Sequence, residues 1–230
     1  MVAALLCGAA VAVGRSRAVD LILLAAYSAR QITNRLFIVD VERGIFLDII
    51  PSTRRSLVGA WSPDGKRLAY IRFDARGSQL SITDSWGSQP HHLPINPYPQ
   101  IPAWSPDGER IAFFNLTLTT LYIWDGSANH AITSPIPMLP SPPTWSPDGT
   151  QIVFVGLING TGELFIMNAD ASAPPRPLVP SYQDERAPLW SPDGRLIVFA
   201  SSRESPLDST LPLFLYDTET RQTRRLTRRG

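Results

Sequence analysis

The stretch Trp61-Ser62-Pro63-Asp64-Gly65 occurs again, unchanged, at three later points of the chain. The later copies occupy residues 104–108, 145–149 and 190–194, so successive tryptophans are 43, 41 and 45 residues apart. Such a period is typical of propeller blades, which contain four short strands each, and it is too long for ankyrin or leucine-rich repeats. The repeat therefore predicts a series of β-sheet blades.

The pentapeptide has the chemistry of a tight turn between two strands. Proline presets φ for the first central position of a turn, aspartate can accept hydrogen bonds from nearby backbone amides, and glycine takes the positive φ that ends it. Each copy is followed by a short apolar run, such as Leu68-Ala69-Tyr70-Ile71, which is typical of a buried strand. The tryptophan, the serine and the following strand are thus expected to form a hairpin.

A second apolar element recurs once in each period and ends in Asp or Asn. This pattern is typical of a strand that enters a turn toward a more polar outer strand. Five such elements are present, at residues 36–40, 80–84, 121–125, 164–168 and 213–217. Outer strands are expected before Thr133 and at residues 224–227.

The first blade has fewer predicted strands than the others. Strands are expected at 21–27, 36–40 and 46–50, but no Trp-Ser-Pro-Asp-Gly strand precedes them. Either residues 10–13 supply the innermost strand, or the chain is a piece of a larger ring that is unclosed or partial. The predicted fold is an all-β propeller of about five four-stranded blades, the first of them incomplete.

Composition limits the classes of partner. Hydrophobic residues make up 43% of the chain and charged residues 18%, a balance typical of a globular domain with a sizeable core. Lys and Arg number 21 against 20 Asp and Glu, so the net charge of +1 provides no field that would attract nucleic acid. The single cysteine, Cys7, excludes an internal disulfide.

The N-terminus is apolar over residues 2–13, which is the length of a signal-peptide core and too short to span a bilayer as a helix. Arg15 and Arg17 follow this stretch, whereas a secretory signal has its basic residues in front. We expect a signal-like or anchor-like segment at 1–19, with a possible membrane tether, and propeller repeats at 20–230. The expected location is extracytoplasmic, either periplasmic or secreted.

The chain resembles the TolB-like, WD-like propeller repeat family over residues 20–230. The features that carry this resemblance are the four pentapeptides and the strands that end near Asp. The resemblance implies a periplasmic protein whose propeller binds partner proteins of the cell envelope. The small α/β domain that precedes the propeller in such proteins has no counterpart in this sequence, and we expect five blades where they have six. Many unrelated functions use such repeats.

The repeated residues are interpreted as structural. One tryptophan per blade at a fixed register is what packing between neighbouring blades requires, and each aspartate between Pro and Gly is explained by its turn. Ligand stacking by the tryptophans and cation binding by a ring of aspartates are the functional alternatives. The set comprises Trp61, Asp64, Gly65, Trp104, Asp107, Gly108, Trp145, Asp148, Gly149, Trp190, Asp193 and Gly194.

Catalytic and metal sites find little support in the sequence. The closest approach to a nucleophile elbow, at residues 14–18, lacks the final glycine. His91 and His92 are adjacent, so in a regular strand they cannot both face one ion, and His130 lies far along the chain. We therefore expect no catalytic residue, no metal and no cofactor.

Proline-rich stretches at 90–102, 135–143 and 174–180 precede three of the tryptophan motifs and connect the blades. We expect them to form a rim that presents Tyr98, Met138 and Tyr182 to a protein partner. The predicted function is a non-catalytic binding or scaffolding module, for which the sequence identifies neither a partner nor a small-molecule ligand. Alternatives are the propeller part of a hydrolase or lyase, and an incomplete propeller with no function of its own.

Overall fold

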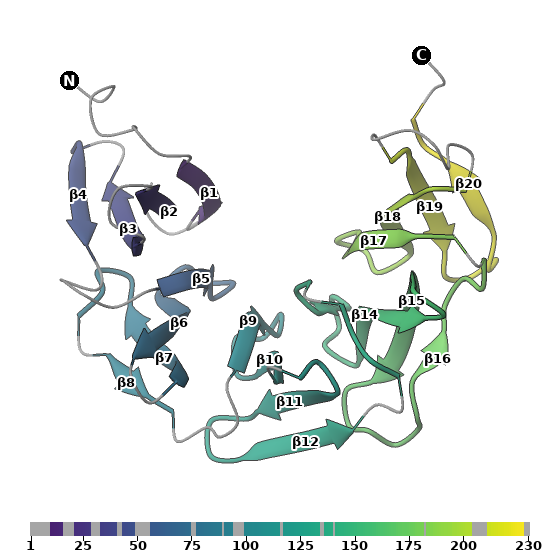
Figure 1. The fold of residues 1–230 in the computed structure, drawn as a ribbon, viewed down its shortest axis with the longest axis horizontal. Coiled ribbons are helices and arrows are strands. Elements are labelled where there is room, and N and C mark those ends of the chain that lie inside the picture. The colour runs from purple at the N-terminus through teal and green to yellow at the C-terminus, as the bar shows by residue number, and fades with distance from the viewer. Residues whose placement is uncertain are drawn as a thin grey trace. The chain divides into compact units, whose positions relative to one another are not determined.

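The structure is a computed structural model and describes residues 10–15, 21–28, 33–40, 43–48, 56–74, 77–88, 90–93, 99–115, 117–133, 136–139, 141–181, 183–203 and 211–227. All regular elements in this part of the chain are strands, arranged in five sheets of four strands each (Figure 1). In each sheet the strands are neighbours in the order in which they occur in the sequence. This is the arrangement of propeller blades, and it confirms the predicted fold class.

The chain divides into two compact units, Met1–Trp104 and Ser105–Gly230. The first two sheets belong to the first unit. The first sheet contains β1 (Ala10–Arg15), β2 (Leu21–Ser28), β3 (Thr33–Asp40) and β4 (Ile45–Asp48). The second contains β5 (Ser56–Trp61), β6 (Arg67–Asp74), β7 (Gly77–Asp84) and β8 (His91–His92).

The third sheet begins with β9 (Pro99–Trp104), at the end of the first unit, and continues with β10 (Ile111–Asn115), β11 (Thr120–Trp124) and β12 (Asn129–Thr133). The fourth contains β13 (Thr144–Trp145), β14 (Gln151–Ile158), β15 (Thr161–Asn168) and β16 (Arg176–Pro177). The fifth contains β17 (Glu185–Trp190), β18 (Leu196–Ser201), β19 (Leu213–Asp217) and β20 (Thr223–Arg225).

The expectation of an incomplete first blade is wrong. Residues Ala10–Arg15 form β1, which pairs antiparallel with β2 from Ala10↔Ala26 to Arg15↔Ile22. This strand holds the place in the first sheet that the tryptophan-bearing strands hold in the others. The apolar N-terminus therefore supplies the innermost strand of this blade, which is the first of the two predicted alternatives. Residues 1–9 and 16–20 lie outside the described part of the chain.

Local sequence accounts for the hairpins. β14 and β15 pair over their full lengths, from Gln151↔Asn168 to Ile158↔Thr161, and the link between them is Asn159-Gly160. Both linking residues have positive φ, 51° and 84°, as a two-residue hairpin turn requires. Asn and Gly are the residues that adopt this conformation at least cost.

The core of the second unit lies between its sheets. All five residues of β10 are buried, which indicates that both faces of that strand are covered. Phe154 stacks on Phe165 at 5.8 Å between ring centroids and meets Phe114 edge-on at 6.2 Å. Each buried aromatic side chain contributes about 1.5–3 kcal/mol through removal of its surface from water.

Candidate functional site

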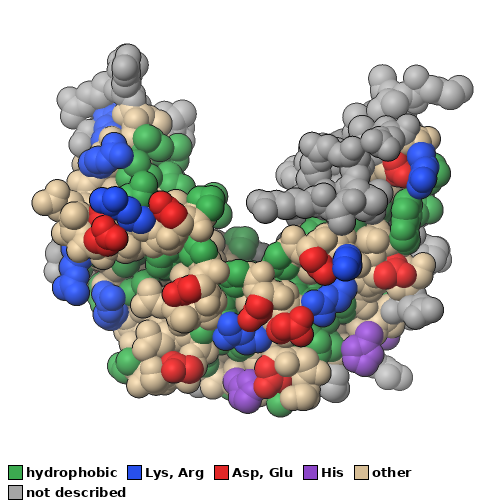
Figure 2. All heavy atoms as spheres, turned by 180° about the vertical axis from the view of Figure 1, so that it is seen from behind, with side chains coloured by type: hydrophobic (Ala, Val, Ile, Leu, Met, Phe, Trp, Pro, Cys, Tyr) green, Lys and Arg blue, Asp and Glu red, His purple; other side chains and the backbone are tan. Residues whose placement is uncertain are grey.

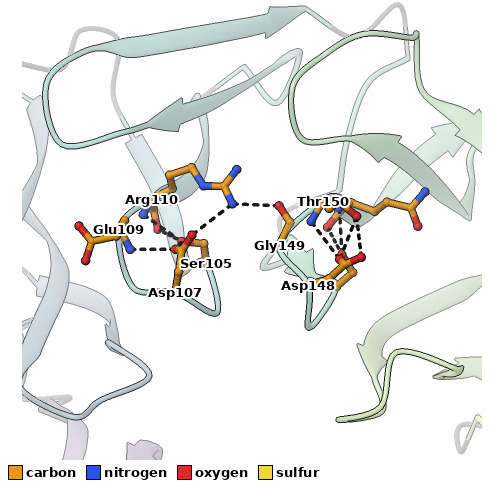
Figure 3. A network of polar contacts seen from close by, with 9 residues as sticks. Ser105, Asp107, Glu109, Arg110, Asp148, Gly149 and Thr150 are labelled. Carbon is orange, nitrogen blue, oxygen red and sulfur yellow. Dashed lines mark hydrogen bonds and ion pairs between the residues drawn. The ribbon is translucent and has the colours of Figure 1, made fainter.

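The repeated Trp-Ser-Pro-Asp-Gly turns share one hydrogen-bond pattern. In the third copy, the Ser146 hydroxyl donates to Asp148 Oδ1 at 2.5 Å, and the Thr150 N–H donates to the same oxygen at 3.0 Å (Figure 3). The Gln151 N–H donates to Ser146 Oγ, and the Gly149 N–H to the Ser146 carbonyl, both at 2.9 Å. The other three copies repeat these contacts.

The aspartates of these turns are held in their charged form. In each copy the serine hydroxyl is the largest influence, and together with a backbone N–H it lowers the pKa of the carboxyl below its usual value. The carboxylates of Asp64, Asp107, Asp148 and Asp193 are thus occupied by the turns that contain them.

The tryptophans join one blade to the next. In the first unit, Trp104 Nε1 donates to the Ala60 carbonyl at 2.9 Å, and the Arg67 guanidinium lies 4.8 Å from the Trp104 ring centroid. The indole is 8% exposed. Its position combines a packing contact, a hydrogen bond and a cation–π contact between successive tryptophan-bearing repeats.

The same contact recurs in the second unit with additional partners. The Arg110 guanidinium lies 4.8 Å from the Trp145 ring centroid, and its Nη2 donates to the Gly149 carbonyl at 2.9 Å. Asp107 Oδ2 is 3.4 Å from the same nitrogen (Figure 3). Gly149 has φ of +69°, which favours glycine, and a Cβ there would lie 2.8 Å from Nη2, so the guanidinium would have to shift to admit a side chain.

The join between the fourth and fifth sheets is built differently. Gln151 stands where the earlier repeats have Arg67 and Arg110. The Thr144 hydroxyl donates to the Pro188 carbonyl at 3.1 Å, and Pro147 lies 3.6 Å from where a Cβ of Gly194 would be. Within the described residues, the buried Nε1 of Trp190 has no hydrogen-bond partner.

The structure contains a buried ion pair, Glu185 with Arg203, that the sequence analysis does not predict. The Glu185 side chain is fully buried and accepts hydrogen bonds from Arg203 Nη2, from Ser181 Oγ at 2.8 Å and from the Leu164 N–H at 3.2 Å. Burial raises the pKa of Glu185, and these donors act in the opposite direction. Through the Leu164 N–H, Glu185 connects β17 to β15, and its only sequence signal is an acidic residue five positions before Trp190.

Of the three predicted rim residues, Met138 is placed differently from the expectation. Its side chain is only 2% exposed, its N–H donates to the Leu118 carbonyl at 2.7 Å, and it bridges to Gly156. The connecting segment runs along β14, which buries the thioether against the blade rather than presenting it to a partner. Tyr98 and Tyr182 lie outside the described residues.

The histidines make local contacts. His91 and His92 are both exposed on β8, and His92 Nδ1 lies 2.8 Å from Ser81 Oγ. His130 Nε2 lies 2.7 Å from Asp125 Oδ2. Among the described residues no group of three or more His, Cys, Asp or Glu side chains is arranged to hold a metal ion. The same part of the chain has no helix with the length and apolarity to cross a bilayer.

A cleft of about 620 Å³ lies in the second unit, beside the turn that joins β11 to β12 and the turn that follows β15. Its charged and polar lining consists of Arg110, Asp125, Asn129, His130 and Asp170. Its apolar lining consists of Ile123, Ala131, Ile132, Ala169 and Ala171.

Charged side chains on the face drawn in Figure 2 are mixed in sign, with acidic and basic groups beside one another. This mixture agrees with the net charge of +1. On that face the described residues therefore form no broad field of one sign that would steer a polyanion.

Solved structures that resemble the chain include two TolB proteins and a lyase. TolB from Acinetobacter baumannii is 23% identical, with a TM-score of 0.59 over 90% of this chain and 57% of its own. A protein described as TolB from Agrobacterium tumefaciens is 19% identical, with a TM-score of 0.68 over 96% and 81%. An oligogalacturonate lyase in complex with manganese is 18% identical, with a TM-score of 0.67 over 91% and 62%.

The similarity to these structures establishes the fold alone. The chain spans little more than half the length of the Acinetobacter protein. No curated protein sequence matches it. The family model of the TolB beta propeller domain matches residues 79–230, which make up most of the chain. We conclude that the chain belongs to the TolB β-propeller domain family.

Proposed function

We propose that this chain is a non-catalytic propeller module that binds a protein partner of the cell envelope, in an extracytoplasmic compartment. The segments that connect the blades form the binding surface. The resemblance to TolB-like proteins supports the class of partner and the compartment.

The observation that supports the proposal is that these connecting segments combine a hydrogen-bonded backbone with exposed side chains. Residues 136–139 are pinned by two hydrogen bonds to β14, from the Leu139 N–H to the Val155 carbonyl at 2.8 Å and from the Leu157 N–H to the Pro137 carbonyl at 2.6 Å. The side chain of Pro137 is nevertheless exposed. A fixed backbone with exposed side chains loses little conformational entropy on binding.

The connection between the fourth and fifth sheets has the same character. Leu178 and Val179 are buried, at 6% and 8% exposure, and the Leu178 N–H donates to the Leu164 carbonyl at 2.8 Å. The adjacent Pro180 is exposed. By contrast, the aspartates that recur in every repeat are occupied by their own turns, which supports a structural rather than a catalytic use of the repeat.

Capture of a partner from a cell-envelope extract tests this proposal. The immobilised chain should retain one protein saturably, and the Tyr98→Ala/Tyr182→Ala variant should lose it while unfolding at the same temperature. The Glu219→Gln variant, changed at an exposed residue of the β19–β20 turn, should bind like the parent. Retention by the tyrosine variant, or turnover of an oligosaccharide or peptide by the purified chain, would contradict the proposal.

A further inference from the structure

An open cavity of about 390 Å³ lies in the second unit, where the fourth sheet meets the fifth. We call it the Trp190 cavity, and the residues that line it include Pro147, Asp148, Gln151, Trp190, Gly194 and Thr218. They lie at the turns β13–β14, β17–β18 and β19–β20. An antiparallel meander places these turns at the end of the blades opposite to the connecting segments. A ligand in this cavity therefore leaves the surface of the proposed function free.

The backbone around the Trp190 cavity repeats that of the preceding join, between the third and fourth sheets. A Cβ on Gly149 would lie 3.7 Å from Pro106 Cδ, and a Cβ on Gly194 would lie 3.6 Å from Pro147 Cδ. The two prolines hold the same position in successive pentapeptides, and so do the two glycines. The two pairs of turns thus approach each other equally closely, and their joins can be compared residue by residue.

The two joins differ in one cationic group. Beside Gly149 lies the Arg110 guanidinium, whose Nη2 would be 2.8 Å from a Cβ at that glycine (Figure 3). Beside Gly194, no described atom outside Pro147 and the chain neighbours lies within 4 Å of the same point. Gln151, which stands where the preceding join has Arg110, lines the cavity without filling it. The Trp190 cavity thus lies where the preceding join holds its guanidinium.

The partners of that guanidinium are all present around the Trp190 cavity. In the preceding join, Arg110 contacts an aromatic ring, a backbone carbonyl and a carboxylate. These groups belong to Trp145, Gly149 and Asp107. The residues at the same positions of the next join all line the cavity, and they are Trp190, Gly194 and Asp148.

The aromatic ring and the glycine are accessible in this join. Trp190 is partly exposed, whereas Trp104 and Trp145, which each lie under a guanidinium, are 8% and 7% exposed. Gly194 is likewise partly exposed, whereas Gly149 is buried. A group that entered the Trp190 cavity could therefore cover the same surface that Arg110 covers in the preceding join.

The Gly194 carbonyl is available as an acceptor. The Thr218 hydroxyl has one hydrogen to donate, and it lies 3.4 Å from the Gly194 carbonyl oxygen but 2.8 Å from the Arg195 carbonyl oxygen. The shorter contact takes that hydrogen. The carbonyl of Gly194 can thus receive an N–H, as the carbonyl of Gly149 does.

Asp148 can accept a further hydrogen bond although its own turn engages it. Its Oδ1 accepts the Ser146 hydroxyl and the Thr150 N–H, and its Oδ2 lies 2.9 Å from the Thr150 hydroxyl. A carboxylate oxygen has two lone pairs, so Oδ2 retains one. Asp107 has the same contacts through Oδ1, and its Oδ2 nevertheless faces Arg110 Nη2 at 3.4 Å. Engagement in the turn is therefore compatible with binding a guanidinium.

We propose that the Trp190 cavity binds a guanidinium group, which stacks on the Trp190 ring and donates to the Gly194 carbonyl and to Asp148 Oδ2. A guanidinium is planar, so it can lie against a ring and donate within its own plane at the same time, which an ammonium cannot do. The group belongs to a small alkylguanidinium compound or to an arginine side chain of a polypeptide.

NMR titration of the full chain with ethylguanidinium, at concentrations well below those that unfold the chain, tests this inference. The indole N–H resonance of Trp190, assigned with Trp190→Phe, reports binding. Ethylguanidinium should shift it saturably and bind at least about tenfold more tightly than the neutral N-ethylurea, because charge-assisted hydrogen bonds are the stronger ones. Ethylammonium should also bind more weakly. No saturable shift, or an affinity no higher than that of either matched compound, overturns the inference.

Variants place the ligand in the Trp190 cavity. Gln151→Arg restores the residue of the earlier joins, so it should fill the cavity, raise the unfolding temperature and abolish binding. Gln222→Arg adds the same charge at an exposed residue and should leave the affinity unchanged. Asp148→Asn should weaken binding about threefold or more. Binding by Gln151→Arg with the affinity of the parent contradicts the assignment.

The source of the guanidinium is distinguished with Nα-acetylarginine N-methylamide, which presents the group on a peptide unit. Affinity several times higher than that of ethylguanidinium assigns the cavity to an arginine side chain, and equal affinity assigns it to a small compound. Gln151→Arg should still retain the envelope partner of the connecting segments. Failure of this inference is therefore distinct from failure of the proposed function.

Discussion

Arg110 lies over the Trp145 ring of the following repeat, 4.8 Å from its centroid, and also donates to the carbonyl of Gly149 in the turn that begins with that tryptophan. One guanidinium thus contacts an aromatic face and a backbone acceptor of the next blade. In this copy of the pentapeptide, the tryptophan and the glycine each provide part of the surface on which the preceding blade rests.

Replacement of Arg110 should loosen this join. The Arg110→Met variant keeps an apolar stem but loses the cation–π contact and the charged hydrogen bond, which should lower the free energy of unfolding by about 1–2 kcal/mol. Urea denaturation followed by tryptophan fluorescence measures the change. Glu109→Gln is the control, because Glu109 is exposed in the same turn. Equal stability of Arg110→Met and the parent would refute the role of the contact.

Gly149 should tolerate alanine less well than a glycine in an open turn. Gly149→Ala meets Arg110 Nη2 at 2.8 Å and has φ of +69°, whereas Gly160→Ala has φ of +84° with nothing within 4 Å. Both variants carry the backbone strain of about 1–2 kcal/mol, and only the first carries the clash. In the Arg110→Met background, which has no guanidinium, Gly149→Ala should cost about as much as Gly160→Ala costs in the parent. Thermal denaturation of the parent, Arg110→Met and the alanine variants in both backgrounds measures these losses, and equal losses from the two alanine substitutions in the parent would mean that the close approach is unimportant.

Acid should weaken the repeated turns. The folded pKa of Asp148 is depressed, chiefly by the Ser146 hydroxyl, so its stabilising effect is complete above the unfolded pKa of about 3.9 and is lost as pH falls through the lower folded value. The stability of the parent should therefore decline below about pH 4, and Asp148→Asn should flatten this decline. Urea titrations between neutral and acid pH measure both slopes. Identical pH profiles would exclude a contribution from Asp148.

Breaking the buried ion pair should cost more than removing it. Arg203→Met leaves the Glu185 carboxylate buried without its cation and should lower stability by about 3–5 kcal/mol. Because burial raises the pKa of Glu185, the loss should grow as pH rises above the unfolded value of about 4.3 and shrink on acidification. Glu185→Gln/Arg203→Met should restore most of the stability. A double variant no more stable than Arg203→Met would contradict this.

The residues that the sequence reasoning placed correctly are those whose environment is local. Pro63, Asp64 and Gly65 determine their turn through contacts within a few positions, and the apolar strands follow the turn at a fixed spacing. The sequence predicts one strand too few for the first blade, because the innermost strand there has no tryptophan motif and is recognisable only through its pairing with β2.

The remaining site residues depend on contacts between distant segments. Glu185 and Arg203 are separated by 18 positions and by β18, and neither is unusual in the sequence before the blade has folded. Met138 was expected at a rim because prolines surround it. Its backbone amide instead needed a partner once the segment lay against β14, and the Leu118 carbonyl provides one.

Photo-cross-linking in cells that produce the chain tests the proposed binding surface most directly. A benzoylphenylalanine at Pro142, exposed in the connection before β13, should cross-link to one protein of the cell envelope, and the same group at Glu219, in a turn at the opposite end of the blades, should not. A cross-link at Pro142 alone is the result that the proposed function predicts. Cross-links to the same protein from Glu219 but not from Pro142, or from neither position, would contradict it.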